Sequence, residues 1–239
     1  MTNGWNESAK AWIADMGENG DFAREFVLDP AIRPLIENRN FANALDVGCG
    51  EGRFCRFLQT LGISPTGIDP TEAFLQQARL KDPDGDYRSG QAERLGFPDE
   101  SFDLVVSYLT LIDIDDAEKA IAEMARVLKP SGTLLVANLN AFITAGNGEN
   151  LGWQKDETGV RQFYAIDDYL QTRANWMSWR DIRIRNWHRP LSAYMAHFLK
   201  NGLQLRHFSE PAPVGGPDEK QSICKRIPYF VLMEWEKNT

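Results

Sequence analysis

Residues 44–54 read Ala-Leu-Asp-Val-Gly-Cys-Gly-Glu-Gly-Arg-Phe, the end of an apolar strand followed by three glycines in the spacing G-x-G-x-G. A helical pattern of apolar residues begins directly after the last glycine and runs to Leu61. Glycine has no Cβ, so it lets the backbone turn tightly and come close to a ligand. A strand, a glycine turn and a helix start in this order predict a nucleotide-binding corner of an α/β fold.

The glycine spacing distinguishes between classes of nucleotide. A dinucleotide-binding fingerprint reads G-x-G-x-x-G, and its third glycine would fall at position 53. Arg53 occupies that position, and Gly52 comes one residue early. The spacing therefore favours a ligand with an adenosine but no pyrophosphate, and it argues against an NAD-dependent oxidoreductase. A tight turn that binds no ligand is the alternative interpretation.

The same stretch resembles motif I of the class I S-adenosyl-L-methionine (SAM)-dependent methyltransferases, which reads hydrophobic-Asp-hydrophobic-Gly-x-Gly-x-Gly. The resemblance is to members that act on small molecules. It implies SAM as the cofactor and S-adenosyl-L-homocysteine (SAH) as its product. It also implies that Asp46, Gly48, Cys49 and Gly50 contact the cofactor.

Length and charge limit the classes of protein. A chain of 239 residues can bury one sizeable α/β core. The formal net charge is -8, whereas nucleic-acid binders usually carry a basic face, so we expect no nucleic-acid partner. Residues 173–189 are locally basic, but Trp and Ile interleave with the arginines, which favours a solvated strand face over RNA contact.

The three cysteines, Cys49, Cys55 and Cys224, cannot all pair, which predicts a reducing, cytoplasmic compartment. No C-x-x-C pair or His/Cys cluster indicates a metal site, so we expect no metal. The first twelve residues lack the apolar core of a signal peptide. No apolar run approaches the roughly 18 residues of a membrane span, so we expect no membrane partner.

Strand and helix patterns alternate along the first half of the chain. Alternation of this kind predicts right-handed crossovers and a parallel, doubly wound sheet. The resemblance further implies a Rossmann-like, mostly parallel seven-stranded sheet whose last strand is antiparallel. The predicted strands are 42–47, 65–68, 87–89, 103–107, 133–138, 203–208 and 227–235, and the predicted helices between them are 53–61, 71–80, 115–128 and 192–201.

We expect a single methyltransferase domain over residues 1–239, divided into four segments. Residues 1–40 are predicted to form a helical cap, and residues 41–140 the cofactor-binding core. Residues 141–189 are aromatic-rich and irregular, which is typical of an inserted lid that contacts a substrate. Residues 190–239 are predicted to form a closing helix and hairpin.

Asp69 ends the second predicted strand, 21 positions after Gly48. A ribose-binding carboxylate is expected about 20 residues past a glycine turn of this kind. The alternative is that Asp69 caps the helix over 71–80, although Thr71 could do so instead. We favour ribose binding, with Pro70 packed flat on the adenine.

Two further stretches match the methyltransferase pattern. Gln91-Ala92-Glu93 resembles the loop of that family that reads the adenine, with an uncharged Gln91 where an Asp is usual. Ser107 and Tyr108 end the fourth predicted strand, which in this fold borders the sulfonium and its methyl group. Core packing is an equal alternative for Tyr108.

The segment before the closing helix, Asn186 to Leu191, resembles a His-Arg-Pro stretch found there in small-molecule methyltransferases. We predict that His188 and Arg189 line the acceptor pocket, with a neutral His188 as the catalytic base. The alternative is structural: a histidine bonded to backbone, and an arginine paired with a carboxylate such as Asp181.

The N-terminal segment also matches a leading helix that folds over the cofactor. Trp12 is predicted to cover the methionyl end of SAM, and Arg24 to bind its carboxylate, with a surface salt bridge as the alternative for Arg24.

The sequence therefore predicts a SAM-dependent methyltransferase that acts on an oxygen or nitrogen atom of a small-molecule acceptor. The absence of an Asn/Asp-Pro-Pro-Tyr/Phe motif after the fourth strand argues against methylation of base amines or glutamine amides. The alternative is a SAM- or SAH-binding protein without transferase activity, acting as a regulatory or scaffold partner. The acceptor is not specified, and neither is the choice between monomer and homodimer.

Overall fold

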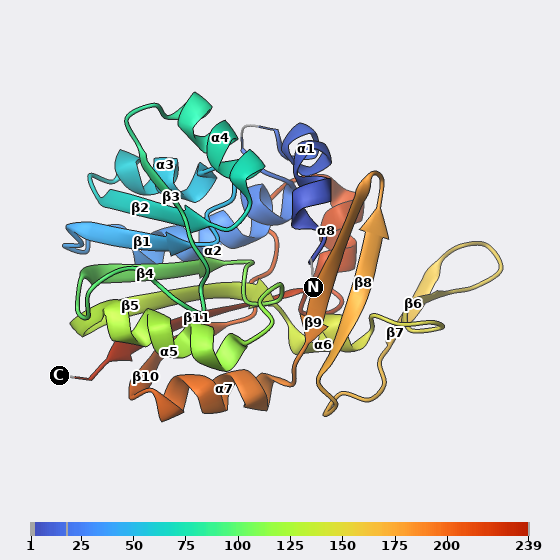
Figure 1. Ribbon diagram of the computed structural model, residues 1–239. Coiled ribbons are helices and arrows are strands. Elements are labelled where there is room, and N and C mark those ends of the chain that lie inside the picture. Colours follow the sequence, from blue (N-terminus) through green and yellow to red (C-terminus); the bar gives the residue numbers. More distant parts are fainter. Residues whose placement is uncertain (1–2, 18, 239) are drawn as a thin grey trace.

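The computed structural model describes residues 3–17 and 19–238. Residues 1, 2 and 18 of the predicted cap and residue 239 of the predicted closing segment therefore lie outside the described residues. The central element is a seven-stranded sheet in the order β10-β11-β5-β4-β1-β2-β3 (Figure 1). Its strands are β1 (Asn43–Val47), β2 (Ser64–Asp69), β3 (Asp86–Ser89), β4 (Phe102–Tyr108), β5 (Leu128–Leu139), β10 (Leu203–Ser209) and β11 (Phe230–Lys237).

The strands from β1 to β5 all pair in parallel, and β11 runs antiparallel to both β5 and β10. The predicted Rossmann-like sheet with an antiparallel last strand is thus confirmed. Parallel pairing brings the carboxyl ends of β1, β2 and β4 to one edge of the sheet. In α/β folds this edge is where ligands bind.

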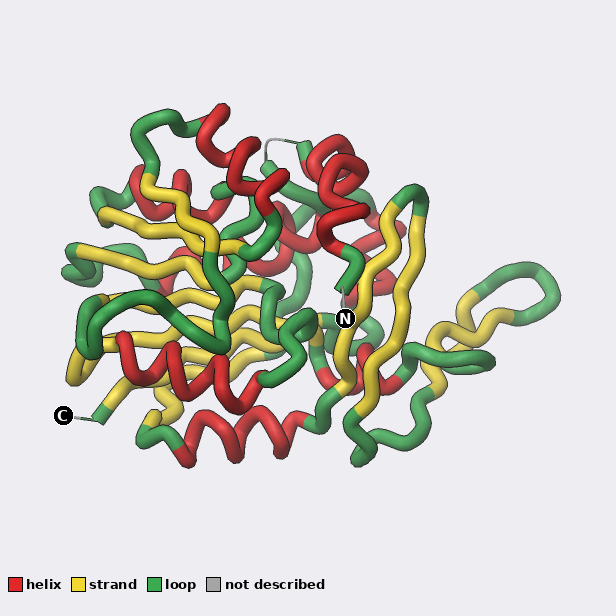
Figure 2. Tube along the Cα trace, viewed as in Figure 1, coloured by secondary structure: helices red, strands yellow, loops and turns green. Residues whose placement is uncertain are grey.

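Helices cover both faces of the sheet, which gives it two buried surfaces (Figure 2). Val105 of β4 packs in one core with α5 (Ala117–Val127) and α7 (Leu191–Lys200), while its neighbours Leu104 and Val106 pack in the other. The second core includes α2 (Asp29–Ile32) and α3 (Arg53–Thr60), and α4 (Glu72–Lys81) covers the end of the sheet near β3. Burial on both faces explains the continuous apolar run of β4.

The N-terminal residues are helical, as predicted. They form α1 (Trp5–Met16), a π-helical turn Arg24–Leu28, α2 and a 3₁₀ turn Arg33–Leu35. The hydroxyl of Ser8 on α1 donates to the carbonyl of Arg183 and accepts from its N–H. These bonds hold α1 against a strand that comes 175 residues later in the chain.

Residues 141–187 are not irregular, which corrects the prediction. They form the short helix α6 (Ala141–Ala145) and two antiparallel hairpins, β6–β7 (Gly152–Lys155 and Arg161–Ala165) and β8–β9 (Arg173–Trp179 and Ile182–His188). The β6–β7 hairpin extends away from the body in Figure 1. In β9 every second residue points inward: Ile182, Ile184, Asn186 and His188. Because two of these inward residues are polar, the sequence does not show the alternation of apolar and polar residues that is typical of a strand.

The end of the chain differs from prediction in one further detail. The loop predicted over 211–217 is followed by a helix, α8 (Asp218–Cys224), and β11 begins only at Phe230. Two acidic residues in the first turn of α8, Asp218 and Glu219, favour a helix start because they complement the helix dipole. This short helix was missed because its few residues show no apolar stripe.

Candidate functional site

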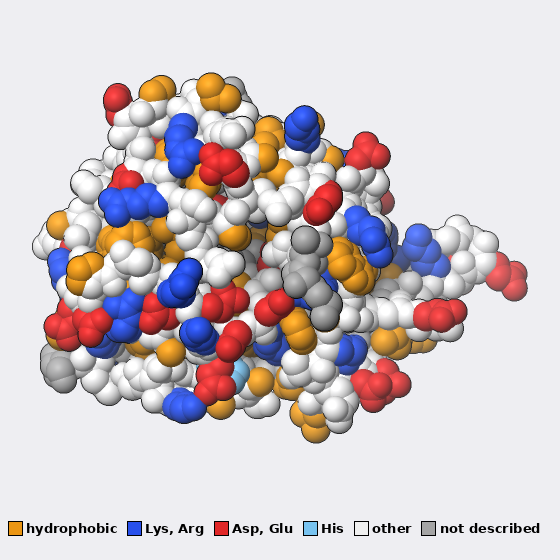
Figure 3. Space-filling view, viewed as in Figure 1, with side chains coloured by type: hydrophobic (Ala, Val, Ile, Leu, Met, Phe, Trp, Pro, Cys, Tyr) orange, Lys and Arg blue, Asp and Glu red, His pale blue; other side chains and the backbone are white. Residues whose placement is uncertain are grey.

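A cavity of about 390 Å³ opens at the carboxyl edge of β1, β2 and β4, which is within the size range of small-molecule sites. Further walls come from α1, the loop 90–93, the loop after β4, and Arg185 of β9. The space-filling view shows acidic and basic side chains interspersed over this face of the molecule (Figure 3). The cavity is lined by all but one of the residues predicted to bind SAM: Trp12, Arg24, Asp46, Gly48, Cys49, Gly50, Asp69, Pro70, Gln91, Ala92, Glu93 and Tyr108.

The glycine turn after β1 has a left-handed backbone at both Gly48 and Gly50, with φ of 78° and 54°. A Cβ on Gly48 would lie 2.3 Å from Cγ2 of Thr110, so this position admits no side chain. A Cβ on Gly50 would meet no described atom within 4 Å, and Gly50 lines the cavity. Gly48 therefore serves close packing, whereas Gly50 presents bare backbone to the cavity.

Asp69 ends β2 as predicted, and its carboxylate has two backbone partners. It accepts the N–H of Gly50 at 3.0 Å and the N–H of Thr71 at 2.8 Å. Burial raises the pKa of this carboxyl group above its usual value. An ionised carboxylate has about four acceptor sites, so capacity remains for donors in the cavity. The N-cap residue of α4 is Thr71, so Asp69 supports the residue before the helix and does not cap it, and a role toward a ligand stays open.

Asp46 lies on β1 below the glycine turn and is 1% exposed. Its Oδ2 is 3.5 Å from the thiol of Cys55, while its Oδ1 has no hydrogen-bond partner among the described residues. Burial raises the pKa of Asp46 to about 7. A buried carboxylate oxygen without a donor is costly, and a cationic or N–H-bearing ligand in the cavity would satisfy it.

Arg24 and Tyr108 form a further part of the cavity wall. The Arg24 guanidinium lies 5.1 Å from the Trp12 ring and 5.9 Å from the Tyr108 ring, and it pairs with Asp21 at 3.2 Å. Arg24 is the first residue of the π-helical turn, a conformation that is frequent at functional sites. The Tyr108 hydroxyl donates to Asp29 at 2.8 Å, and burial raises its pKa.

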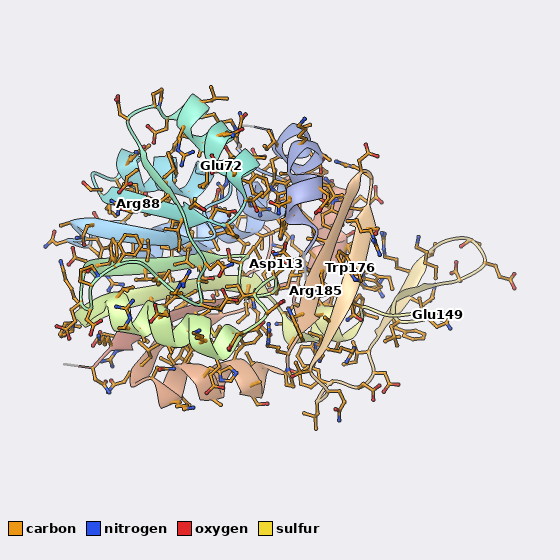
Figure 4. The ribbon with its side chains drawn as sticks, in the orientation of Figure 1. Glu72, Arg88, Asp113, Glu149, Trp176 and Arg185 are labelled. Carbon is orange, nitrogen blue, oxygen red and sulfur yellow. The ribbon has the colours of Figure 1, made fainter. Side chains whose placement is uncertain are left out.

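The loop after β4 carries an acid that the sequence analysis missed. Asp113 lines the cavity, accepts a hydrogen bond from the Asn186 amide at 2.5 Å, and lies near Arg185 in Figure 4. Arg185 is itself paired with Asp115. Asp113 is one of three acids within four residues, so its spacing alone does not distinguish it from its neighbours.

His188 and Arg189, which are predicted to line the acceptor pocket, are not among the residues that line this cavity. The His188 ring is fully buried, 2.8 Å from Thr144 Oγ1 and 2.8 Å from the Tyr169 carbonyl, and burial lowers its pKa. Arg189 is also buried and donates to backbone carbonyls of the loop after β4 rather than to Asp181. The backbone bond of His188 agrees with the structural alternative, whereas Arg189 bonds to carbonyls and not to a carboxylate.

Ser107 is the predicted cofactor residue that the cavity leaves out. Its side chain is completely buried, and its hydroxyl has no partner among the described residues. Successive side chains of a strand point to opposite faces, so Tyr108 enters the cavity wall while Ser107 does not.

The aromatic residues of 141–189 do not line the cavity either. Phe142, Phe163 and Trp176 are instead exposed, at 45%, 62% and 46%. The aromatic side chains of the cavity wall come from other segments: Trp5, Trp12, Phe54, Phe74 and Tyr108.

Within residues 3–17 and 19–238, no group of three or more His, Cys, Asp or Glu side chains is placed to hold a metal ion. Over the same residues, every helix is too short or too polar to cross a membrane.

The sheet order and the position of the cavity define a class I methyltransferase fold. A SAM-dependent methyltransferase from Mesorhizobium loti has a similar structure, with 25% identity, a TM-score of 0.78, and coverage of 92% of this chain and 100% of that one. A Listeria monocytogenes protein is similar in fold, with 24% identity, a TM-score of 0.79, and coverage of 88% and 96%.

Sequence comparison finds methyltransferases that match part of this chain. Residues 45–136 match the methyltransferase domain model. A malonyl-[acyl-carrier protein] O-methyltransferase of Salmonella typhimurium is 34% identical over 46% of this chain and 43% of its own length. A ubiquinone biosynthesis O-methyltransferase of Chelativorans sp. is 33% identical over 59% and 54%. The chain spans about half the length of these relatives, and it is similar to class I SAM-dependent methyltransferases in its fold and over residues 45–136.

Proposed function

We propose that this protein transfers a methyl group from SAM to an oxygen or nitrogen atom of a small-molecule acceptor. The observation that carries the proposal is the convergence of the Gly50 backbone, the Asp69 carboxylate and the unpartnered Asp46 oxygen on one cavity. SAM supplies an activated methyl group, so the protein's task is to bind and align the two substrates.

The residues present fit a SAM molecule along the length of the cavity. Asp69 would accept hydrogen bonds from the ribose hydroxyls, and the backbone at Gly50 would pass close to the ligand. Asp46 would face the ammonium group, whose charge stabilises the ionised form of a carboxyl with a raised pKa. The remaining contacts are proposed for Gly48 and Cys49 (glycine turn), Pro70, Gln91, Ala92 and Glu93 (adenine), and Trp12, Arg24 and Tyr108 (methionyl end).

An oxygen acceptor is favoured within this proposal, because the relatives named above are O-methyltransferases. A binding protein without transferase activity is less well supported. Asp113, Asp115 and Arg185 also line the cavity and have no proposed SAM contact, which leaves polar groups for a second ligand. The free thiols of all three cysteines suit the proposed cytoplasmic compartment.

Calorimetry with SAM, SAH and NAD tests the first half of the proposal. We expect SAM and SAH to bind and NAD not to bind, and binding of NAD alone would overturn the proposal. An acceptor screen that measures SAH formation tests the second half. SAH binding without SAH formation over a broad screen would favour the binding-protein alternative.

A further inference from the structure

Asp113 is an acid of the cavity that the proposed SAM contacts do not use. It lies in the loop that follows β4, between the glycine turn and the β8–β9 hairpin. Thr110 of the same loop packs on Gly48, and Asp113 itself bonds to Asn186 of β9. Figure 4 labels Asp113 beside Arg185 at this point. The side chain therefore belongs to the part of the cavity that remains for an acceptor.

The carboxylate of Asp113 is held in one orientation. The amide of Asn186 donates to its Oδ1 at 2.5 Å. Arg189 fixes the loop from behind, because its guanidinium donates to three backbone carbonyls: Leu111 at 3.2 Å, Ile114 at 2.6 Å and Asp115 at 2.8 Å. Arg189 is thus a positioning residue for Asp113, and the carboxylate keeps acceptor capacity toward the cavity.

The surroundings of Asp113 make its carboxyl group a stronger base than an exposed aspartate. Burial raises its pKa to about 7, the charge of Asp69 raises it further, and the charge of Arg24 lowers it. Two further charged groups line the same cavity and form an ion pair: Arg185 on β9, and Asp115 in the same loop as Asp113. A general base works best when its pKa lies near the working pH.

We propose that Asp113 is the general base of the reaction and that the acceptor presents a neutral hydroxyl group to it. This inference rests on the proposed function. In the transfer step the acceptor oxygen forms a bond to the methyl carbon as the carbon–sulfur bond of SAM breaks. The bonding pair goes to sulfur, which leaves neutral SAH sulfur. The hydroxyl proton moves to a carboxylate oxygen of Asp113 and is later released to water.

The position of Asp113 discriminates between classes of acceptor. An ionised carboxylate acceptor has no proton to lose, so it needs no base, and the charge of Asp113 would repel it. A hydroxyl acceptor needs a base and gains a hydrogen bond from the same group. The geometry therefore selects alcohols or phenols over carboxylic acids.

The test combines a measurement on the protein alone with a turnover measurement. Carbon-13 NMR of carboxyl-labelled aspartate, with Asp113 assigned by its loss in Asp113→Asn, should show titration near pH 7. A panel of phenols, alcohols, benzoates, malonate half-esters and primary amines is then screened with SAM, and SAH release is measured. We expect turnover of hydroxyl compounds, a loss of about 100-fold or more in kcat for Asp113→Asn, and loss of the rise in rate between pH 6 and 8. The exposed Asp84→Asn serves as the matched control and should behave as the wild type.

The outcomes separate this inference from the proposed function. SAH that fails to bind the wild type overturns both. If SAH binds, the base assignment alone is overturned by titration of Asp113 near 4, or by Asp113→Asn with an unchanged pH profile. Turnover of carboxylates or amines in place of hydroxyl compounds, or of no panel compound, overturns the acceptor class. An Asp113→Asn variant that still binds SAH as tightly as the wild type shows that its loss of rate is not a loss of folding.

Discussion

The carboxylate of Asp69 accepts the backbone N–H of Gly50 at 3.0 Å, so the end of β2 and the glycine turn after β1 form one rigid unit. This bond fixes the direction in which Gly50 faces the cavity. The glycine turn and the Asp69 carboxylate therefore hold fixed positions relative to each other before a ligand binds. The first prediction tests whether the open side of Gly50 is where SAM passes.

Gly50→Ala should weaken SAH binding at least about tenfold, because the added methyl group enters the cavity at a backbone that SAM must approach. The left-handed conformation of Gly50 adds a cost of about 1–2 kcal/mol to the folded state. Gly62→Ala is the matched control, since Gly62 also has a positive φ and no described neighbour within 4 Å, but lies in the turn between α3 and β2. Equal loss of SAH binding in both variants would contradict the assignment.

Arg24→Gln should weaken SAH binding about tenfold or more and leave 5′-methylthioadenosine binding nearly unchanged. The first ligand has a carboxylate for the guanidinium to bind, and the second lacks the amino-acid end. Isothermal calorimetry of both ligands measures the effect. Arg33→Gln, on the exposed Arg33–Glu37 pair, provides the control. Similar losses for the two ligands would show that Arg24 acts on the fold of the cap and not on a carboxylate.

SAH affinity should fall as the pH is lowered through about 7, by up to about tenfold per pH unit. Asp46 has a pKa of about 7, so below that pH it is neutral and no longer attracts an ammonium group. Asp46→Asn should bind more weakly and lose this pH dependence. Asp113→Asn should keep it, which separates the two acids with similar pKa values. A pH-independent affinity in the wild type would contradict the role of Asp46.

His188→Ala should lower the free energy of unfolding by about 2–3 kcal/mol and leave kcat within a few-fold of the wild type. The ring is buried and bridges Thr144 and the Tyr169 carbonyl, and its removal leaves a cavity and unpaired groups. Urea unfolding and SAH release measure the two quantities. A large loss of kcat with unchanged stability and SAH affinity would restore the catalytic role predicted from the sequence.

The lowered pKa of His188 also predicts a pH effect on stability. The folded state binds a proton at His188 less tightly than the unfolded chain does. The stability that the neutral, buried ring contributes is therefore fully present above about pH 6.5 and is lost as the pH falls below it. The difference in urea midpoint between the wild type and His188→Ala should therefore shrink as the pH falls from 7.5 to 5.5. Asp46 and Asp113, with raised pKa values, act in the opposite direction but do so in both proteins. A difference that stays constant over that range would contradict the assignment to His188.

The donor side of the cavity could be predicted because it is encoded locally. Asp46, Gly48 and Gly50 lie in one strand and its turn, and Asp69 ends the next strand. In a parallel sheet the carboxyl ends meet at one edge, so the sequence order already implies their proximity.

The acceptor side could not be predicted in the same way, because it is assembled from distant segments. Whether His188 faces a cavity or a core depends on how β9 packs, and the strand alternation from Ile182 onward was the available indication that it turns inward. Asp113 becomes distinctive only when Asn186, which is 73 residues away, donates to it. The aromatic residues of 141–189 predict a lid, but amino-acid composition does not specify which surface those side chains face.

The bonds between Ser8 on α1 and Arg183 on β9 have a consequence for biosynthesis. The sheet strands β1 to β5 are complete once residue 139 has been made, and they pair without help from the ends of the chain. Helix α1 has its partner only after residue 183 has left the ribosome. A contact of such sequence separation forms late. During synthesis the protein should therefore hold a folded sheet with an open, unfinished cavity, and the cavity wall that α1 forms should be completed only after β9 has emerged.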